Sequence, residues 1–499
     1  SYYYRSRQKA LRSFGCDRAM KIKLVLHTVG KVLLLEAILM LLPLIVAVIY
    51  GEGDLAAFAI SIAITAAAGL IFNLAFKSDG KALYTRDGLA IAALSWIGIS
   101  VFGALPFIIS GSIPSPADAF FETVSGFTTT GASILTDVEA LPHGLLFWRS
   151  FTHWIGGMGV LVFIMAVMDK APDRSVNILR AEMPGHSVDK FTPRASGTAK
   201  ILYYIYLALT VIEIILLICS GMPLFDSIVH ALGTAGTGGF GIKADSIASY
   251  SAASQWIISV FMLLFGVSFN IYYLIMAKRG REIFKMNELR TYLGISVAAM
   301  LIIALNIYPI YKSADDAIRL SAFQVSSIVT TTGYATADFD RWPELSKSIL
   351  LILMFFGGCM GSTAGGLKMS RVTVLMQVIR NDLRHALRPR EVSSVILNGR
   401  RLDTQGEKQV LSYFAVYMVV ISAAFLLISF EPFGFETNFT AAVSCVNNIG
   451  PGLAGVGPSL SYAGYSVFSK LILSFAMLLG RLEIYPLLLL LSPQIWTKR

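Results

Sequence analysis

Long apolar segments separated by short polar stretches run through almost the whole chain. The first two, about 32–50 and 55–76, are each about long enough to cross a bilayer, since a spanning helix needs roughly 20 apolar residues. They predict an N-terminal two-helix unit over residues 32–76. Residues 1–31, which precede this unit, are basic and are predicted to lie outside the bilayer.

One arrangement of segments then occurs four times: an apolar span, a short apolar segment, a polar loop that contains glycine, and a second span. We place these units at residues 87–168, 200–277, 291–379 and 408–491. Their spans are expected near 87–110 and 145–168, 200–221 and 254–277, 291–311 and 346–379, and 408–430 and 464–491. The short segments are too brief to cross a bilayer and are interpreted as pore helices, at 117–127, 225–235, 319–329 and 436–446. The pattern predicts an all-α polytopic membrane protein with ten transmembrane helices, namely the two N-terminal helices and four pseudo-fourfold helix–pore helix–filter loop–helix repeats.

The four polar loops are related in sequence, and we call them filter loops 1 to 4. They read Thr128-Thr129-Thr130-Gly131, Gly236-Thr237-Gly238-Gly239, Thr330-Thr331-Thr332-Gly333 and Asn447-Asn448-Ile449-Gly450. When the loops are aligned on the last glycine, the residue six positions before it is always small: Ser125, Gly233, Ser327 or Ser444. A long-period internal repeat of this kind indicates four copies of one structural unit.

The loops have the composition expected of a cation site within a membrane. Non-helical backbone at membrane depth is tolerated only where it is buried in protein or lines a water-filled cavity. A dehydrated cation needs oxygen ligands, which a ring of backbone carbonyls supplies, and glycine reaches the φ > 0 conformations that turn carbonyls inward. The alternative is that each loop is merely a turn between helices, but four aligned loops favour a shared site. The candidate cation-binding residues are Thr129, Thr130, Gly131, Thr237, Gly238, Gly239, Thr331, Thr332, Gly333, Asn448, Ile449 and Gly450.

The second span of the third unit is interrupted by a glycine-rich stretch, residues 357–366, which we call the gate loop. Each glycine costs about 1 kcal/mol relative to alanine within a helix, so a continuous helix is not expected here. The hypothesis is a mobile intramembrane gate just inside the filter loops, and the alternative is a static kink that lets helices pack closely. The candidate gate residues are Gly357, Gly358, Gly361, Ser362, Thr363, Gly365 and Gly366.

Arg481 lies inside the last span, where a charge is expensive and usually functional. It is predicted to project into the pathway below the filter loops and to act with the gate loop as a barrier. The alternatives are a structural ion pair with Glu483 or a helix-end cap. Lys368 has a similar role or marks the inner boundary of the membrane, and Glu122, His230 and Gln324 are interpreted as braces of the pore helices.

Composition and charge support this interpretation. Of the 499 residues, 55% are hydrophobic and only 14% are charged, whereas soluble proteins carry about 25% charged residues. The net charge of +10 comes from segments on one predicted side, which follows the positive-inside rule and places both termini in the cytoplasm. These segments are residues 1–31, 77–86, 169–200, 278–290 and 380–408. The basic charge therefore reports orientation, and no nucleic-acid partner is expected. The four cysteines lie far apart, with neither disulfide nor zinc spacing.

The chain resembles the Trk/Ktr/HKT superfamily of cation transporters from about residue 30 onward. The resemblance rests on the four fused units, one filter glycine per unit, the glycine-rich break in unit three and the arginine in the last span. Two additional N-terminal spans make it similar to the bacterial Trk-type membrane subunits. The resemblance implies a channel-like fold and gated potassium uptake across a bacterial inner membrane. It also implies a potassium ion in the filter and no covalently bound cofactor.

The resemblance has further implications for selectivity and partners. Sodium-selective plant relatives carry serine at the position of Gly131, so glycine there implies potassium selectivity. Loop 4 departs most from the others, so the ring cannot be truly fourfold. A homodimer within the lipid bilayer and a cytoplasmic, nucleotide-binding TrkA-like regulatory subunit are implied. Segments 169–200 and 380–408 are candidate docking surfaces for it, or are topology signals alone.

Two alternative functions stay open. The sequence does not distinguish proton- or sodium-coupled symport through the same pathway from channel-like flow. No buried acidic relay is evident in it. A polytopic membrane enzyme has little support, since the sequence lacks H-E-x-x-H, G-x-S-x-G and a pair of intramembrane aspartates.

Overall fold

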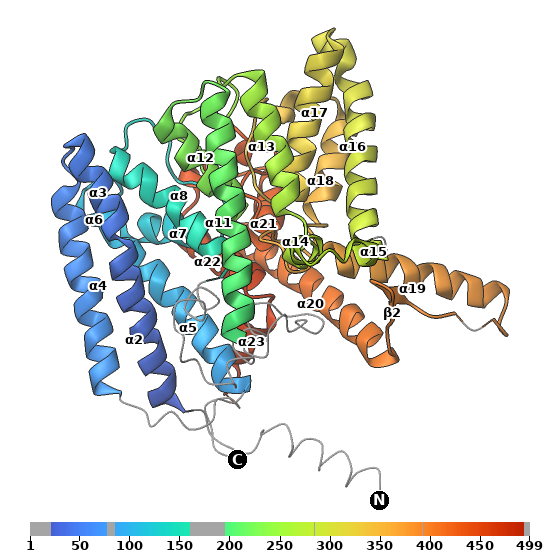
Figure 1. The fold of residues 1–499 in the computed structure, drawn as a ribbon, viewed down its shortest axis with the longest axis horizontal. Coiled ribbons are helices and arrows are strands. Elements are labelled where there is room, and N and C mark those ends of the chain that lie inside the picture. Colours follow the sequence, from blue (N-terminus) through green and yellow to red (C-terminus); the bar gives the residue numbers. More distant parts are fainter. Residues whose placement is uncertain (1–20, 77–84, 160–194, 284, 392, 494–499) are drawn as a thin grey trace, which may run out of the picture.

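The computed structural model describes residues 21–76, 85–159, 195–283, 285–391 and 393–493. These residues are mostly helical (Figure 1). The all-α prediction misses one small element, an antiparallel hairpin of β1 (Ile396–Leu397) and β2 (Arg400–Arg401). The predicted segments 77–86 and 169–200 lie mostly outside the described residues, as do residues 160–168 of the span predicted at 145–168.

The N-terminal unit consists of α2 (Ile22–Leu39) with α3 (Leu41–Tyr50), followed by α4 (Leu55–Ala75). Helix α2 begins about ten residues before the start predicted for the first span, so the helix includes the end of the basic segment 1–31. The reason is that Val25, Val29 and Val32 are buried at helical spacing, which continues the packed face through the basic residues. The helices cross closely where Gly30 of α2 meets Gly69 of α4.

The repeated arrangement of the four units is present in the structure. Each unit begins with a long helix: α5 (Thr85–Gly103), α11 (Ala195–Cys219), α16 (Asn287–Tyr311) and α20 (Thr404–Ile428). A short helix then precedes each filter loop: α7 (Pro116–Phe127), α12 (Leu224–Gly236), α17 (Ala314–Val329) and α21 (Phe435–Asn447). A helix follows each loop: α8 (His143–Gly157), α13 (Ala252–Phe265), α18 (Glu344–Met354) and α22 (Val467–Arg481). In Figure 1, α2 and α4 lie at one side and α16 to α18 at the other, with α12, α21 and α22 between them.

The helices after the loops are more broken than predicted. The break within 346–379 occurs at the gate loop, and α19 (Met369–Leu387) follows it. The predicted spans 254–277 and 464–491, however, are not continuous. The first divides into α13 and α14 (Phe269–Met276), which are bent by 89° relative to each other. The second divides into α22 and α23 (Tyr485–Leu491).

Short helices complete the connections between these elements: α6 (Leu105–Ile109), α15 (Gly280–Ile283) and the 3-10 helices η2 (Phe339–Arg341), η3 (Ala454–Val456) and η4 (Tyr462–Gly464). Among the described residues, six helical stretches are long and apolar enough to cross a membrane, or seven if α13 and α14 count as one. The chain is therefore a mostly helical polytopic membrane protein. The count of ten spans stays a prediction, because the broken halves are too short to qualify singly.

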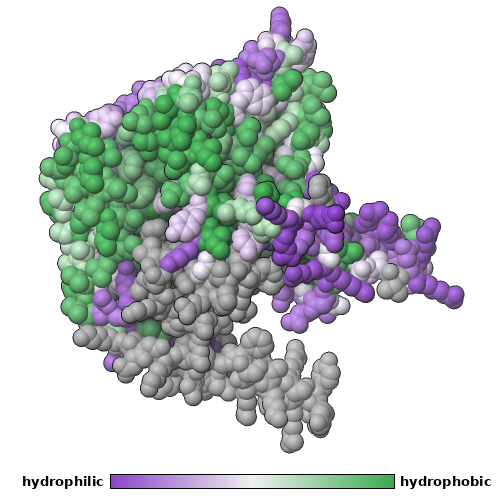
Figure 2. All heavy atoms as spheres, in the orientation of Figure 1, coloured by the Kyte–Doolittle hydropathy of each residue, from purple (hydrophilic) through white to green (hydrophobic). Residues whose placement is uncertain are grey.

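The surface divides into apolar and hydrophilic regions. Figure 2 shows apolar residues over the face of the helical body, and hydrophilic residues along one rim and over the end that carries α19 and the hairpin. Large apolar side chains such as Leu305 and Ile49 are exposed on the helices. We call the side of α19 and the hairpin the inner side, because the charge pattern predicts that it faces the cytoplasm.

Candidate ion-binding site

Each short helix that precedes a filter loop ends in the same backbone turn. The second residue of every filter loop has a left-handed backbone conformation, with φ of 56° at Thr129, 54° at Thr237, 56° at Thr331 and 56° at Asn448. The next N–H donates to the carbonyl of the small residue noted in the sequence. These bonds join Thr130 to Ser125 (2.9 Å), Gly238 to Gly233 (2.9 Å), Thr332 to Ser327 (2.8 Å) and Ile449 to Ser444 (3.0 Å). A left-handed residue with such a closing bond is the Schellman end of a helix.

The last residue of every filter loop is a glycine that is also left-handed. The φ values are 79° at Gly131, 77° at Gly239, 87° at Gly333 and 100° at Gly450. When two left-handed residues are separated by one residue of ordinary conformation, the chain turns sharply. Glycine takes the second left-handed position at no steric cost. The recurring glycine is therefore required by the backbone of each loop.

The four loops meet in a closed ring. A β-carbon added to each glycine would lie less than 3.0 Å from the carbonyl oxygen of the middle residue in a neighbouring loop. Around the ring these pairs are Gly131 with Gly238, Gly239 with Thr332, Gly333 with Ile449, and Gly450 with Thr130. The structure thus brings all twelve candidate residues together, in the order of loops 1, 2, 3 and 4. Four backbone carbonyls, one from each loop, contact this ring of glycines.

The ring is not fourfold in its side chains. Loops 1 and 3 contain matching hydroxyl pairs, Thr128 with Thr130 and Thr330 with Thr332, both at 2.8 Å. Loop 4 is instead tied by Asn448, whose Nδ2 donates to Thr130 Oγ1 (2.9 Å). The same Nδ2 also donates to the carbonyl oxygen of Met477 in α22 (2.9 Å). The departure of loop 4 from the repeat therefore links it to loop 1 and to the last helix.

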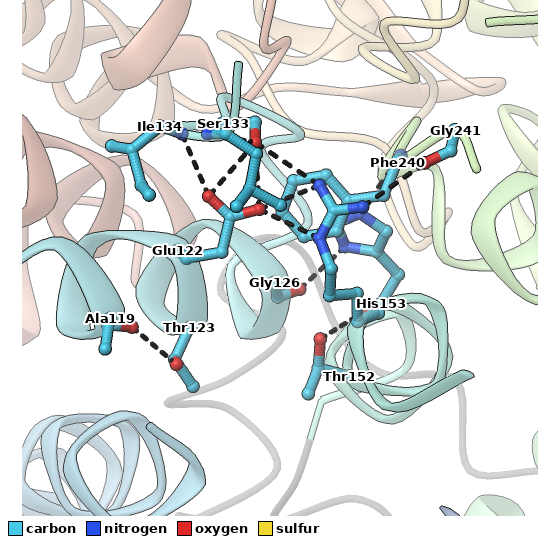
Figure 3. A network of polar contacts seen from close by, with 12 residues as sticks. Ala119, Glu122, Thr123, Gly126, Ser133, Ile134, Thr152, His153, Phe240 and Gly241 are labelled. Carbon is cyan, nitrogen blue, oxygen red and sulfur yellow. Dashed lines mark hydrogen bonds and ion pairs between the residues drawn. The ribbon is translucent and has the colours of Figure 1, made fainter. Parts of the chain in front are cut away.

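A buried ion pair lies behind loop 1 (Figure 3). Arg149 Nη2 of α8 lies 2.7 Å from Glu122 Oε1 of α7, and both side chains are almost fully buried. Glu122 also accepts from Ser133 Oγ (3.0 Å) and the N–H of Ile134 (3.0 Å), which follow the loop. Arg149 Nη1 donates to the carbonyl of Gly241 beyond loop 2 (3.2 Å). The pair therefore fixes the segments that follow loops 1 and 2.

His153 joins the same two segments from α8. Its Nδ1 donates to the carbonyl of Gly126 in α7 (2.7 Å), and its Nε2 accepts from the N–H of Phe240 (3.3 Å). Arg149 lies over the Phe240 ring at 4.0 Å. Neither Arg149 nor His153 was singled out from the sequence, although a charge inside the predicted span 145–168 was a usable signal.

The other predicted braces differ in their contacts. Gln324 Nε2 donates to the carbonyl of Ala337 beyond loop 3 (3.4 Å). His230 Nδ1 instead bonds within its own helix, to the carbonyl of Asp226 (2.8 Å).

The gate loop lies directly against the inner end of the ring. The N–H of Gly365 donates to Thr331 Oγ1 (2.6 Å), and a β-carbon on Gly365 would lie 2.5 Å from the carbonyl oxygen of Asn447. Gly357 and Gly366 contact each other closely, so the two ends of the loop meet. The glycines allow both approaches.

The loop also fills the break between α13 and α14. The N–H of Cys359 donates to the carbonyl of Gly266 (2.9 Å), and the N–H of Phe269 donates to the carbonyl of Gly361 (2.9 Å). Gly358 packs against Gly266 as well. These bonds occupy the backbone groups that the bend exposes, which explains why the span 254–277 is not continuous. The two hydroxyls of the loop bond to nearby carbonyls, Ser362 to Cys359 (2.6 Å) and Thr363 to Phe265 (3.3 Å).

Arg481 joins the ring, the gate loop and the end of α8. Its Nη1 donates to Thr129 Oγ1 (3.0 Å) and to the carbonyl of Thr363 (2.8 Å). Its Nη2 donates to the carbonyls of Gly156 (2.5 Å) and Gly157 (2.6 Å). The alternative partner considered for it, Glu483, is instead paired with Arg371. A cavity of about 60 Å³ beside the ring is lined by Arg481, Lys368 and the gate loop, among others.

A helical membrane protein with four related loops that converge on one ring of carbonyls is built around a central pathway rather than a surface site. The chain belongs to the TrkH family, described as cation transport proteins, whose pattern matches residues 54–498.

Relatives match over almost their full length. The Trk system potassium uptake protein TrkH of Salmonella typhimurium is 35% identical over 483 residues, which cover 96% of this chain and 100% of that protein. The Trk system potassium uptake protein TrkG of Escherichia coli is 33% identical over 481 residues, covering 95% and 99%. The crystal structure of the potassium transporter TrkH from Vibrio parahaemolyticus superposes with a TM-score of 0.87 at 32% identity, covering 96% of this chain and 100% of that one.

Proposed function

We propose that the protein takes up potassium across a bacterial inner membrane through a gated pore whose selectivity filter is the ring of filter loops. The observation that carries the proposal is the closed ring, in which each glycine abuts a carbonyl of a neighbouring loop. Such carbonyls replace the hydration shell of a cation without adding full charges. The relatives named above are called potassium uptake proteins, and that supports potassium as the ion.

In this proposal the ion is held by carbonyl and hydroxyl oxygens of the twelve filter residues, with no other cofactor. Arg481 and the gate loop form the barrier on the inner side. The positive charge of Arg481 beside Thr129 disfavours a cation there, and the gate loop closes the remaining space. Transport then requires that both move away from the ring.

The finer architecture and the assembly are part of the same proposal. Ten spans follow if each broken helix counts as one crossing, with both termini in the cytoplasm. A homodimer and a cytoplasmic TrkA-like regulatory subunit are proposed as partners. The inner end offers a surface for the latter, because exposed arginines gather on α19, on the segment after it and on the hairpin: Arg380, Arg384, Arg388, Arg390, Arg400 and Arg401.

The test is uptake of rubidium-86 into liposomes that contain the purified protein, with excess potassium or sodium as competitor. The proposal expects competition by potassium and little by sodium. Equal competition would contradict potassium selectivity. Absence of uptake, both alone and after addition of the cytoplasmic partner, would contradict the transport function itself.

Proton-coupled symport is a second candidate, and one observation favours it. Glu36 of α2 and Glu213 of α11 are buried within predicted spans, and their carboxyl oxygens form no hydrogen bond of ordinary geometry within the described residues. Neither residue was considered in the sequence interpretation that no buried acidic relay is evident. Buried acids inside a membrane are typical of proton relays. Uptake that follows an imposed proton gradient, and loses this dependence in Glu213→Gln, would favour symport. The enzyme alternative has no support, since the relatives named above are transporters.

A further inference from the structure

A buried ion pair connects the two parts of the inner barrier. Arg371, in the first turn of α19, donates through Nη2 to Glu483 Oε2, just beyond the end of α22. Each side chain is only 10% exposed. The pair joins unit three to unit four at positions that follow the gate loop and Arg481 directly in the chain.

Arg371 is held in place by more than its ionic partner. Its Nη1 donates to the carbonyl of Leu367, the residue after the gate loop (3.1 Å). Its guanidinium lies over the ring of Tyr413 in α20, at 3.8 Å from the centroid. A guanidinium stacked and hydrogen-bonded in this way presents a fixed donor to Glu483. The geometry is therefore suited to holding a backbone segment in position.

The segments that the pair joins are strained. Glu483 and Ile484 have φ of 53° and 65°, and the N–H of Tyr485 donates to the carbonyl of Glu483 (2.7 Å). Ile484 is thus the centre of a γ-turn with φ > 0, which is rare, and a β-branched residue is disfavoured there. Lys368, at the start of α19, has φ of 73°. Strained backbone persists only where surrounding contacts hold it, and it is common in switch regions.

The pair also lies between two cavities. Glu483 lines both the cavity of about 60 Å³ beside the ring and a groove of about 880 Å³ on the inner side. Arg371 lines only the groove, whereas Arg481 and Lys368 line only the smaller cavity. Separation of the pair would move the wall between them.

We infer that the Arg371–Glu483 ion pair is a latch that holds the gate loop and Arg481 together in the closed position. This inference rests on the proposed function of the barrier. In the latched state the strained turn after Arg481 and the strained start of α19 are fixed to each other. When the pair separates, both strained segments relax, the barrier leaves the ring and the two cavities join. Arg371 and Glu483 act as positioning residues and do not touch the ion.

The test uses a native thiol as a probe of the gate loop, so that it does not depend on transport. Cys359 lies in the gate loop and is 1% exposed. With Cys16, Cys219 and Cys445 replaced by alanine, the rate of Cys359 alkylation by a small maleimide reports opening of the loop. Arg371→Gln and Glu483→Gln are expected to raise this rate about tenfold, which lies within the usual range of coupling between two sites. Arg371→Lys keeps the charge but loses the stacked guanidinium, so it is expected to label more slowly than Arg371→Gln without reaching the wild-type rate. The exchange of Arg371→Glu with Glu483→Arg is expected to label more slowly than either charge reversal alone.

Asp118→Asn is the matched control, because Asp118 pairs with Lys470 between α7 and α22 at 2.7 Å, away from the gate loop. Its labelling rate should stay at the wild-type value. Labelling of both glutamine variants at the wild-type rate would overturn the latch. So would labelling that stays fast in both Arg371→Lys and the exchanged pair. Rubidium uptake by the same preparations, alone and with the cytoplasmic partner added, tests the proposed function separately. Wild-type protein without uptake in both conditions would contradict transport and leave the labelling result to decide the latch.

Discussion

Arg481 Nη1 donates a hydrogen bond to Thr129 Oγ1 at 3.0 Å, so a fixed positive charge of the last unit touches the left-handed residue of the first filter loop. Two like unit charges 4 Å apart repel by about 4 kcal/mol at an effective dielectric constant of 20. In the proposed function, a cation that leaves the ring on the inner side would therefore meet a substantial electrostatic barrier as well as a steric one.

Neutralising this charge should increase ion flow. We expect Arg481→Gln to raise rubidium uptake into liposomes by about tenfold or more, since each tenfold in rate corresponds to about 1.4 kcal/mol of barrier. Arg341→Gln is a suitable control, because Arg341 is exposed on η2. Uptake equal to wild type over a range of membrane voltages would refute the barrier role.

A side chain at a ring glycine should be unfavourable for two separable reasons, namely the contact with a neighbouring carbonyl oxygen and the positive φ. Gly131→Ser places a β-carbon against the carbonyl oxygen of Gly238 at a φ of 79°, so we expect weaker preference for potassium over sodium in competition uptake. Gly111→Ser is the matched control, since Gly111 has a φ of 76° and nothing within 4 Å of its added β-carbon. Equal selectivity of the two variants would mean that the contact in the ring does not set ion preference.

The Glu122–Arg149 pair should contribute strongly to stability. Glu122→Ala leaves the buried Arg149 without its ionic partner, and breaking such a pair typically costs about 3–5 kcal/mol. The midpoint temperature of thermal unfolding in detergent should be markedly lower for Glu122→Ala than for the wild type. Glu344→Ala removes an exposed carboxylate that pairs with Lys347 at the surface, and surface pairs are worth about 0–1 kcal/mol. Similar shifts for both variants would show that the buried network does not stabilise the filter loops.

The contact between the gate loop and the ring can be tested with one methyl group. A β-carbon on Gly365 would lie 2.5 Å from the carbonyl oxygen of Asn447, so Gly365→Ala should push the loop from the ring and raise uptake. Gly294 on α16 has no atom within 4 Å of an added β-carbon, so Gly294→Ala should leave uptake unchanged. If Gly365→Ala transports as wild type does, the close packing of the loop is not what keeps the pathway shut.

The positions of the four related loops and of the break between α18 and α19 could be predicted from the sequence because each has a local signal. Aligned glycines mark the loops, and five glycines in ten residues break a helix wherever they occur. Arg481 was found because a charge in an apolar segment is conspicuous. The same signal was present for Arg149 and Arg371 within predicted spans and was not used.

The remaining features depend on contacts between distant parts of the chain. The bend after α13 has no local cause beyond Gly266, whose carbonyl is taken by Cys359 of the next unit. The turn at Glu483 and Ile484 contains residues that favour neither a break nor a positive φ. The cyclic order of the four loops is likewise a tertiary property, since each glycine meets a carbonyl of another unit.

The bond from Asn448 to Thr130 closes the ring across 318 residues of sequence. During synthesis the first loop enters the bilayer long before its last neighbour exists, so its polar groups have incomplete protein contacts at that stage. A shortened chain that lacks the fourth unit would therefore hold three loops with no means of closing, and its exposed carbonyls would make it a natural target for membrane quality control. The filter loops can therefore close into a ring only after the fourth unit has been synthesised.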